Sequence, residues 1–106
     1  MLSVPEAGLA VLGAGRRDFG EDAGPPALAR HVRDGEERPA PWLAEARIER
    51  VSDQHAMVAL PDGAGVRVGD VVALSPSHPC TTFDKWRAIH VVDEATTVLE
   101  TVRTYF

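Results

Sequence analysis

Short apolar runs separated by turn-forming residues dominate the chain. The first run, residues 8–12, is bounded by proline and glycine and predicts a buried strand. Further strands are predicted over residues 44–51, 55–60, 66–74, 86–92 and 96–105. Within residues 44–51 the alternation puts Ile48 on the face opposite Glu49. Turn signals recur about every ten residues and no long amphipathic helix is evident, so we predict an all-β domain built as a closed or partly closed small barrel.

Residues 20–41 interrupt this pattern. They are rich in glycine, proline and charge, and they contain the turn signals Pro25-Pro26 and Asp34-Gly35. We therefore expect a long irregular loop with one short helical turn over residues 27–32, which leaves His31 in solvent. Loops of this length are usually functional, packed against a partner, or mobile.

Length and charge limit the number of domains and the kinds of partner that the chain can have. The 106 residues suffice for one compact domain, residues 1–106, and the chain starts and ends in the manner of a domain cut from a longer protein. The net charge of −5 argues against nucleic acid and anionic membranes as partners. No apolar run is long enough to span a membrane, and no signal peptide is evident. The single cysteine, Cys80, excludes an internal disulfide and indicates a reducing, cytoplasmic setting.

The segment of residues 74–86 carries the densest chemistry. His78 and Cys80 stand two residues apart, so an extended backbone would place both side chains on one face. Imidazole and thiolate are preferred zinc ligands, and Pro76 and Pro79 would restrict the backbone around them. Two ligands do not make a structural zinc site, so spacing alone favours a surface histidine beside a buried, inert cysteine. A two-ligand site is reasonable where water, substrate or another domain completes the shell.

Other polar residues are weaker candidates for a functional site. His55 precedes a predicted strand, where it could contact a ligand, brace an active-site wall, or belong to a turn-capping cluster. His90 lies within a predicted strand and is interpreted as structural. Gly13-Ala14-Gly15 is not a dinucleotide-binding loop, because Asp18 stands where that motif requires glycine. The following residues form a mixed-charge cluster typical of a solvated face: Arg16, Arg17, Asp18, Glu21 and Asp22.

Residues 69–86 resemble the C-terminal domain of the D-serine dehydratase and D-threonine aldolase family. These are fold-type III pyridoxal-phosphate enzymes similar to alanine racemase. The most specific part is the string Ser-His-Pro-Cys-Thr-Thr-Phe-Asp-Lys-Trp at residues 77–86, which is closest to bacterial amino acid deaminases. Residues 8–18, Asp53-Gln54-His55 and residues 102–106 match further motifs of that domain.

The resemblance implies a two-domain parent enzyme. Its N-terminal TIM barrel, absent from this chain, would bind pyridoxal phosphate through a lysine, and the β-domain would hold zinc through His78 and Cys80. Family dehydratases carry His-x-Cys and aldolases His-x-Asp, so Cys80 favours a dehydratase. Zinc would then assist loss of the β-hydroxyl from a D-serine-like substrate, which yields a keto acid and ammonia.

The resemblance also sets expectations for partners and for alternatives. The partners would be the N-terminal barrel, a small D-amino acid and a second subunit of a homodimer. The isolated chain should be inactive because it lacks the cofactor lysine. A D-threonine aldolase-like domain, a racemase domain and an independent β-barrel binding module remain the alternatives.

Overall fold

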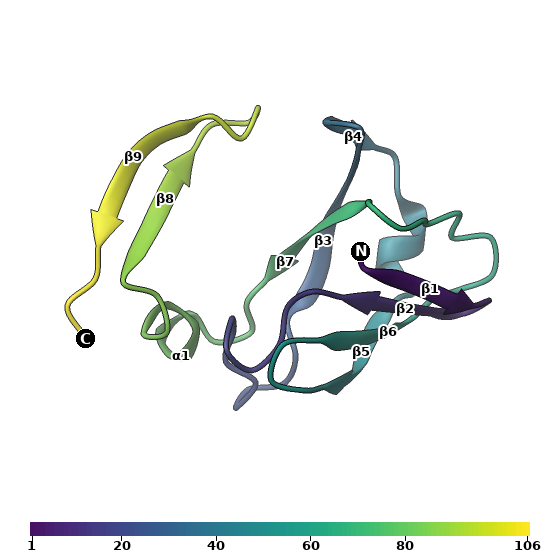
Figure 1. Ribbon diagram of the computed structural model, residues 1–106, viewed down its shortest axis with the longest axis horizontal. Coiled ribbons are helices and arrows are strands. Elements are labelled where there is room, and N and C mark those ends of the chain that lie inside the picture. Colours follow the sequence, from purple (N-terminus) through teal and green to yellow (C-terminus); the bar gives the residue numbers. More distant parts are fainter.

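The computed structural model describes residues 1–106 and shows a domain made mostly of strands (Figure 1). The strands are β1 Ser3–Glu6, β2 Leu9–Leu12, β3 Ala27–Arg33, β4 Glu36–Arg38, β5 Arg47–Val51, β6 Ala56–Ala59, β7 Val71–Ser75, β8 Ala88–Val92 and β9 Val98–Arg103. Two short helices complete the chain, the 3-10 helix η1 (Pro41–Ala44) and the α-helix α1 (Pro79–Phe83). Neither has the length and apolar character needed to cross a membrane. The predicted all-β class is confirmed.

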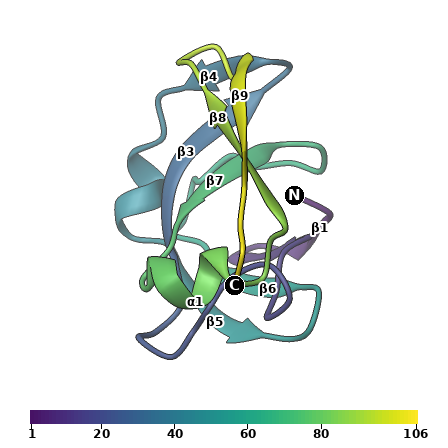
Figure 2. The ribbon, with the colours of Figure 1, turned by 90° about the vertical axis from the view of Figure 1, so that its left-hand side faces the viewer.

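The strands form three antiparallel sheets rather than one hydrogen-bonded ring. The first has the order β1-β2-β6-β5, the second β4-β3-β7, and the third is the β8–β9 hairpin. Figures 1 and 2 show that the hairpin projects from the other two sheets and joins them through α1. The domain therefore consists of a two-sheet body and a separate hairpin, whose turn contacts the body where Arg30 Nη2 donates to the Glu94 carbonyl at 3.5 Å.

The core lies where β2 and β6 pair. Ala10 faces Val58 and Leu12 faces Ala56 across the two strands, and all four side chains are buried. Residues that alternate along a strand point to one face, so this register places a continuous apolar row inside. The other buried hydrophobic residues are Phe19, Leu28, Trp42 and Ile48. Ile48 is buried and Glu49 is exposed, so the prediction that they lie on opposite faces of the strand is confirmed.

Residues 20–41 are more regular than the sequence indicated. Residues 27–33 form β3, so the expected helical turn is wrong, and β3 pairs with β4 on one side and β7 on the other. Asp34 and Gly35 connect β3 to β4 with φ angles of 53° and 80°. Positive φ at both central residues is the requirement of a tight hairpin turn, for which Asp-Gly is a strong signal. The strand was missed because much of its stabilisation comes from β7, which is distant in sequence.

Two other predicted strands begin later than expected. Pro41 starts η1, since its fixed φ suits a first helical position. This helix buries Trp42 and includes Ala44, so β5 begins only at Arg47. The strand predicted over residues 66–74 is extended only from Val71, because Gly69 adopts a φ of 92° in the turn before it. Residues 66–70 instead form a loop that ends in the buried Asp70.

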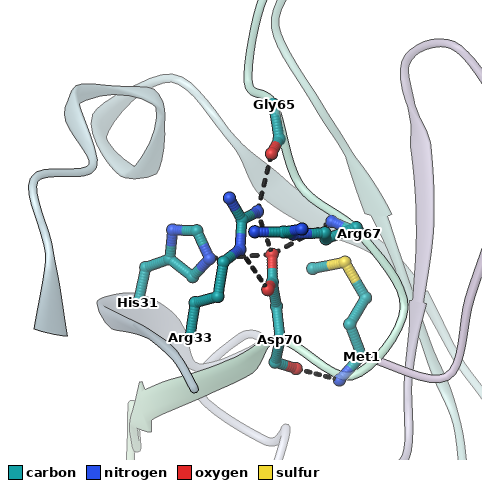
Figure 3. A network of polar contacts seen from close by, with 6 residues as sticks. All are labelled: Met1, His31, Arg33, Gly65, Arg67 and Asp70. Atoms are coloured by element: carbon teal, nitrogen blue, oxygen red, sulfur yellow. Dashed lines mark hydrogen bonds and ion pairs between the residues drawn. The ribbon is translucent and has the colours of Figure 1, made fainter. Parts of the chain in front are cut away.

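Asp70 is the centre of a buried polar network (Figure 3). Its carboxylate accepts hydrogen bonds from Arg33 Nε and Nη2, both at 2.7 Å, and from the Arg67 backbone N–H at 3.0 Å. His31 Nε2 lies 2.8 Å from the same carboxylate. The Met1 amino group donates to the Asp70 carbonyl. The hydrogen bonds from Arg33 hold the pKa of Asp70 well below its ordinary value, although burial acts in the opposite direction.

The expectation that His31 lies in solvent is wrong. Its side chain is buried on β3, between Asp70 and the ring of Trp42, which it meets edge-on with centroids 5.5 Å apart. A buried polar side chain is destabilising unless it has a partner, and Asp70 provides one. His31 and Asp70 together connect β3 to the start of β7.

Candidate metal site around His78 and Cys80

The segment that carries His78 and Cys80 is a helix start rather than an extended loop. His78 is the N-cap residue with φ −135° and ψ 100°, Pro79 occupies the first turn, and Cys80 belongs to α1. The expectation of an extended segment is therefore wrong, because the chain turns into α1 at Pro79 and Cys80 lies in the first turn of that helix. Cys80 carries a free, exposed thiol, so the expectation of a buried cysteine is wrong.

His78 is held by a residue that sequence reasoning did not single out. Its Nδ1 lies 2.6 Å from Asp22 Oδ2, and Thr81 donates its hydroxyl to Asp22 Oδ1, also at 2.6 Å. The pKa of Asp22 is lowered by its hydrogen bond from Thr81, which has the largest effect, and by its hydrogen bond from His78. Nδ1 is engaged by Asp22, whereas Nε2 makes no hydrogen bond. The local pattern around Asp22 predicts only a solvated charge cluster, because nothing in it points to a histidine 56 residues away.

The loop around Asp22 is bound tightly to α1. The Gly20 backbone N–H donates to the buried Thr82 hydroxyl at 3.0 Å, and Trp86 Nε1 donates to the Asp18 carbonyl at 2.8 Å. The Ser77 hydroxyl donates to the Gly24 carbonyl at 2.5 Å. These bonds connect residues 18–24 with residues 77–86 and so place Asp22 beside His78.

His78 Nε2 and Cys80 Sγ are the types of ligand that zinc prefers, but two ligands are fewer than the four of a structural zinc site. The carboxylate on the other ring nitrogen of His78 is also the usual arrangement for a metal-bound histidine. No group of three or more His, Cys, Asp and Glu side chains is arranged to hold a metal ion. The chain thus offers at most two protein ligands here, and a metal ion held by them would need water, substrate or another domain to complete its coordination.

The remaining histidines have local roles in the structure. The His55 carbonyl accepts hydrogen bonds from the Ser52 backbone at 2.8 Å and from the Ser52 hydroxyl at 3.3 Å, which is a turn-capping arrangement. No hydrogen bond or ion pair joins His55 to His78. On the hairpin, His90 Nδ1 lies 2.9 Å from the Thr101 hydroxyl on the facing strand. Neither residue is brought to the candidate site by a direct polar contact.

The Gly13-Ala14-Gly15 turn has a packing role. The Gly15 N–H donates to the Asp18 carboxylate, and the Arg16 and Arg17 N–H groups donate to the carbonyls of residues 52 and 53. A Cβ on Gly15 would lie 2.4 Å from the Ser52 carbonyl oxygen. Glycine is needed for this close approach, and the occupied N–H groups are not available to a phosphate.

Comparisons with known proteins identify the family. The family model described as "Putative serine dehydratase domain" matches residues 1–92. The solved structure of D-threonine aldolase from Filomicrobium marinum matches with a TM-score of 0.70 and 27% sequence identity, over 94% of this chain and 24% of that one. The chain thus spans about a quarter of the length of that relative. No curated protein matches the chain. The family match and the shared fold show that the protein belongs to the D-serine dehydratase and D-threonine aldolase family and corresponds to its C-terminal β-domain.

Proposed function

We propose that the chain is the zinc-binding β-domain of a larger pyridoxal-phosphate-dependent D-amino acid dehydratase. The observation that carries the proposal is the arrangement of His78. Its Nδ1 contacts a carboxylate, its Nε2 makes no hydrogen bond, and it immediately precedes the helix that bears the exposed Cys80 thiol. The presence of the His-x-Cys pair in a member of this family supports the dehydratase assignment.

The residues of this chain would bind and orient the metal. His78 Nε2 and Cys80 Sγ, the latter as thiolate, are the two protein ligands, and Asp22 keeps the imidazole turned toward the ion. When bound, zinc supplies a Lewis acid for the leaving β-hydroxyl of a D-serine-like substrate, and pyridoxal phosphate on the missing domain supplies an electron sink. With neither the cofactor lysine nor a phosphate site, the chain alone is inactive.

The β8–β9 hairpin supports the proposal of a partner domain. Its two strands pair only with each other, and a two-stranded hairpin alone is at best marginally stable in water. Large apolar side chains are exposed on it: Val91, Val92, Val98, Leu99 and Val102. Exposed apolar surface of this kind is typical of an interaction site, which the N-terminal barrel or a second subunit would cover.

The similarity to a D-threonine aldolase favours one second candidate, an aldolase acting on a D-β-hydroxy amino acid. Product analysis on the full-length parent enzyme separates the reactions. A keto acid and ammonia identify a dehydratase, glycine and an aldehyde identify an aldolase, and the inverted amino acid identifies a racemase. Release of ammonia from D-serine by the isolated chain with added pyridoxal phosphate would contradict the proposed need for a second domain.

Zinc binding by the chain is the direct test of the metal pair. We expect His78→Ala and Cys80→Ser each to lower zinc affinity by about 100-fold or more, because each removes one of only two protein ligands. Affinity is measured by competition with a chromophoric chelator, with His90→Ala as the matched control. Equal zinc affinity in wild type, His78→Ala and Cys80→Ser would contradict the metal site and favour the binding-module alternative.

A further inference from the structure

Asp22 and Thr81 form a hydrogen-bonded relay behind His78. We propose that Asp22 is the positioning residue of the metal site: it selects the tautomer and the ring orientation of His78, while Thr81 holds the Asp22 carboxylate in place. The inference rests on the proposed function, since it concerns how the same histidine is presented to zinc.

The contact between Asp22 and His78 determines which ring nitrogen is open. A carboxylate can only accept a hydrogen bond, so the proton of a neutral His78 ring must lie on Nδ1, which is 2.6 Å from Asp22 Oδ2. The lone pair is then on Nε2, where a metal can bind it. In metal sites, a partner on the second ring nitrogen fixes the ring orientation and raises the basicity of the ligand.

The Asp22 carboxylate is itself held by the helix that carries the cysteine. Thr81 donates to Asp22 Oδ1 at 2.6 Å, and the same hydroxyl lies 3.3 Å from the His78 carbonyl oxygen. His78, Asp22 and Thr81 thus form a closed set of contacts around the first turn of α1. Both carboxylate oxygens are engaged, which leaves Asp22 little freedom to turn away from His78.

A purely structural role for the Asp22–His78 contact makes a different prediction. The two side chains are 52% and 38% exposed, and contacts between such exposed groups contribute little to stability. If the contact only attached residues 18–24 to α1, its loss would cause a small change in thermal midpoint and no specific change at the histidine ring. A positioning role predicts instead a large change in metal affinity.

The test measures zinc affinity and the His78 tautomer in Asp22→Ala, Asp22→Asn and Thr81→Val. We expect Asp22→Ala to lower zinc affinity about 10- to 100-fold, with smaller losses in the other two variants. Nitrogen-15 NMR of the zinc-free chain should show the Nδ1–H form of His78 in the wild type and a mixture of tautomers in Asp22→Ala. The matched control is Glu21→Gln, because Glu21 is a neighbouring acid that pairs with Arg16 and not with His78.

The outcomes separate this inference from the proposed function. If His78→Ala abolishes zinc binding while Asp22→Ala and Asp22→Asn bind zinc as wild type does, with an unchanged tautomer, the positioning role is overturned and the metal site stands. If the wild-type chain and His78→Ala are alike in zinc binding, the metal site fails and the positioning role fails with it. Asp22→Asn nearly preserves the side-chain volume, so it keeps the test valid should Asp22→Ala fold poorly.

Discussion

Replacing Asp70 with asparagine is expected to lower the free energy of unfolding by about 3 kcal/mol, the scale for removing one partner of a buried ion pair. Asp70 is 2% exposed, and its carboxylate accepts both Arg33 donors and the Arg67 N–H while it contacts His31. An asparagine would present an amide group to one of these donors and leave Arg33 without its counter-charge. In a domain of this size such a loss lowers the thermal midpoint by roughly 15 °C.

Thermal and urea unfolding of Asp70→Asn and wild type measure the effect. Asp62→Asn is the matched control, because Asp62 lies exposed in the turn after β6 and the substitution makes the same chemical change. A midpoint for Asp70→Asn equal to that of the control would show that the network of Figure 3 does not stabilise the fold.

The Asp70 network should also make stability depend on acid. The folded-state pKa of Asp70 lies well below its ordinary value, so its stabilisation is fully present above the unfolded-state pKa of about 3.9. It is lost as the pH falls from there toward the folded-state pKa. The wild-type thermal midpoint should therefore fall below about pH 4, and Asp70→Asn should lose part of this dependence. Asp22 and Glu37, whose pKa values are also lowered, account for a remaining slope in the variant.

Gly20→Ala is expected to disturb both stability and the candidate metal site. A Cβ at residue 20 would lie 2.1 Å from the Thr81 hydroxyl oxygen and 3.0 Å from the Thr81 carbonyl oxygen. To relieve these contacts α1 must move, which weakens the bond from the Gly20 N–H to Thr82 and displaces Thr81 from Asp22. We expect a loss of about 1–3 kcal/mol in the free energy of unfolding. Zinc affinity should fall as well.

The control for this substitution is Gly13→Ala. Its new Cβ would meet only the side chain of Leu2, at 3.1 Å, and that side chain is flexible and more than half exposed. Urea unfolding and chelator competition should leave Gly13→Ala close to the wild type. Equal behaviour of the two variants would show that the approach of residue 20 to α1 is not a constraint.

Much of the fold could be predicted from the local pattern of the chain. Alternation put Ile48 and Glu49 on opposite faces of one strand, the apolar run of residues 8–12 contains β2, and the apolar run within residues 55–60 contains β6. These predictions depend only on side-chain periodicity along a single strand, and periodicity is a property of neighbouring residues. The string around His78 and Cys80 was specific enough to indicate the family, which the family match confirms.

The partners of the polar side chains were decided only by the tertiary structure. The Asp70 carboxylate contacts His31, which lies 39 residues away in the sequence, and His78 contacts Asp22, which lies 56 residues away. Each pair forms because packing brings two distant segments together, and no periodicity along either segment encodes the other. For the same reason His31 was expected in solvent and Asp22 on a solvated face. Local pattern thus determined most of the strands and the family motif, whereas long-range packing produced β3 and selected the hydrogen-bond partners around the candidate site.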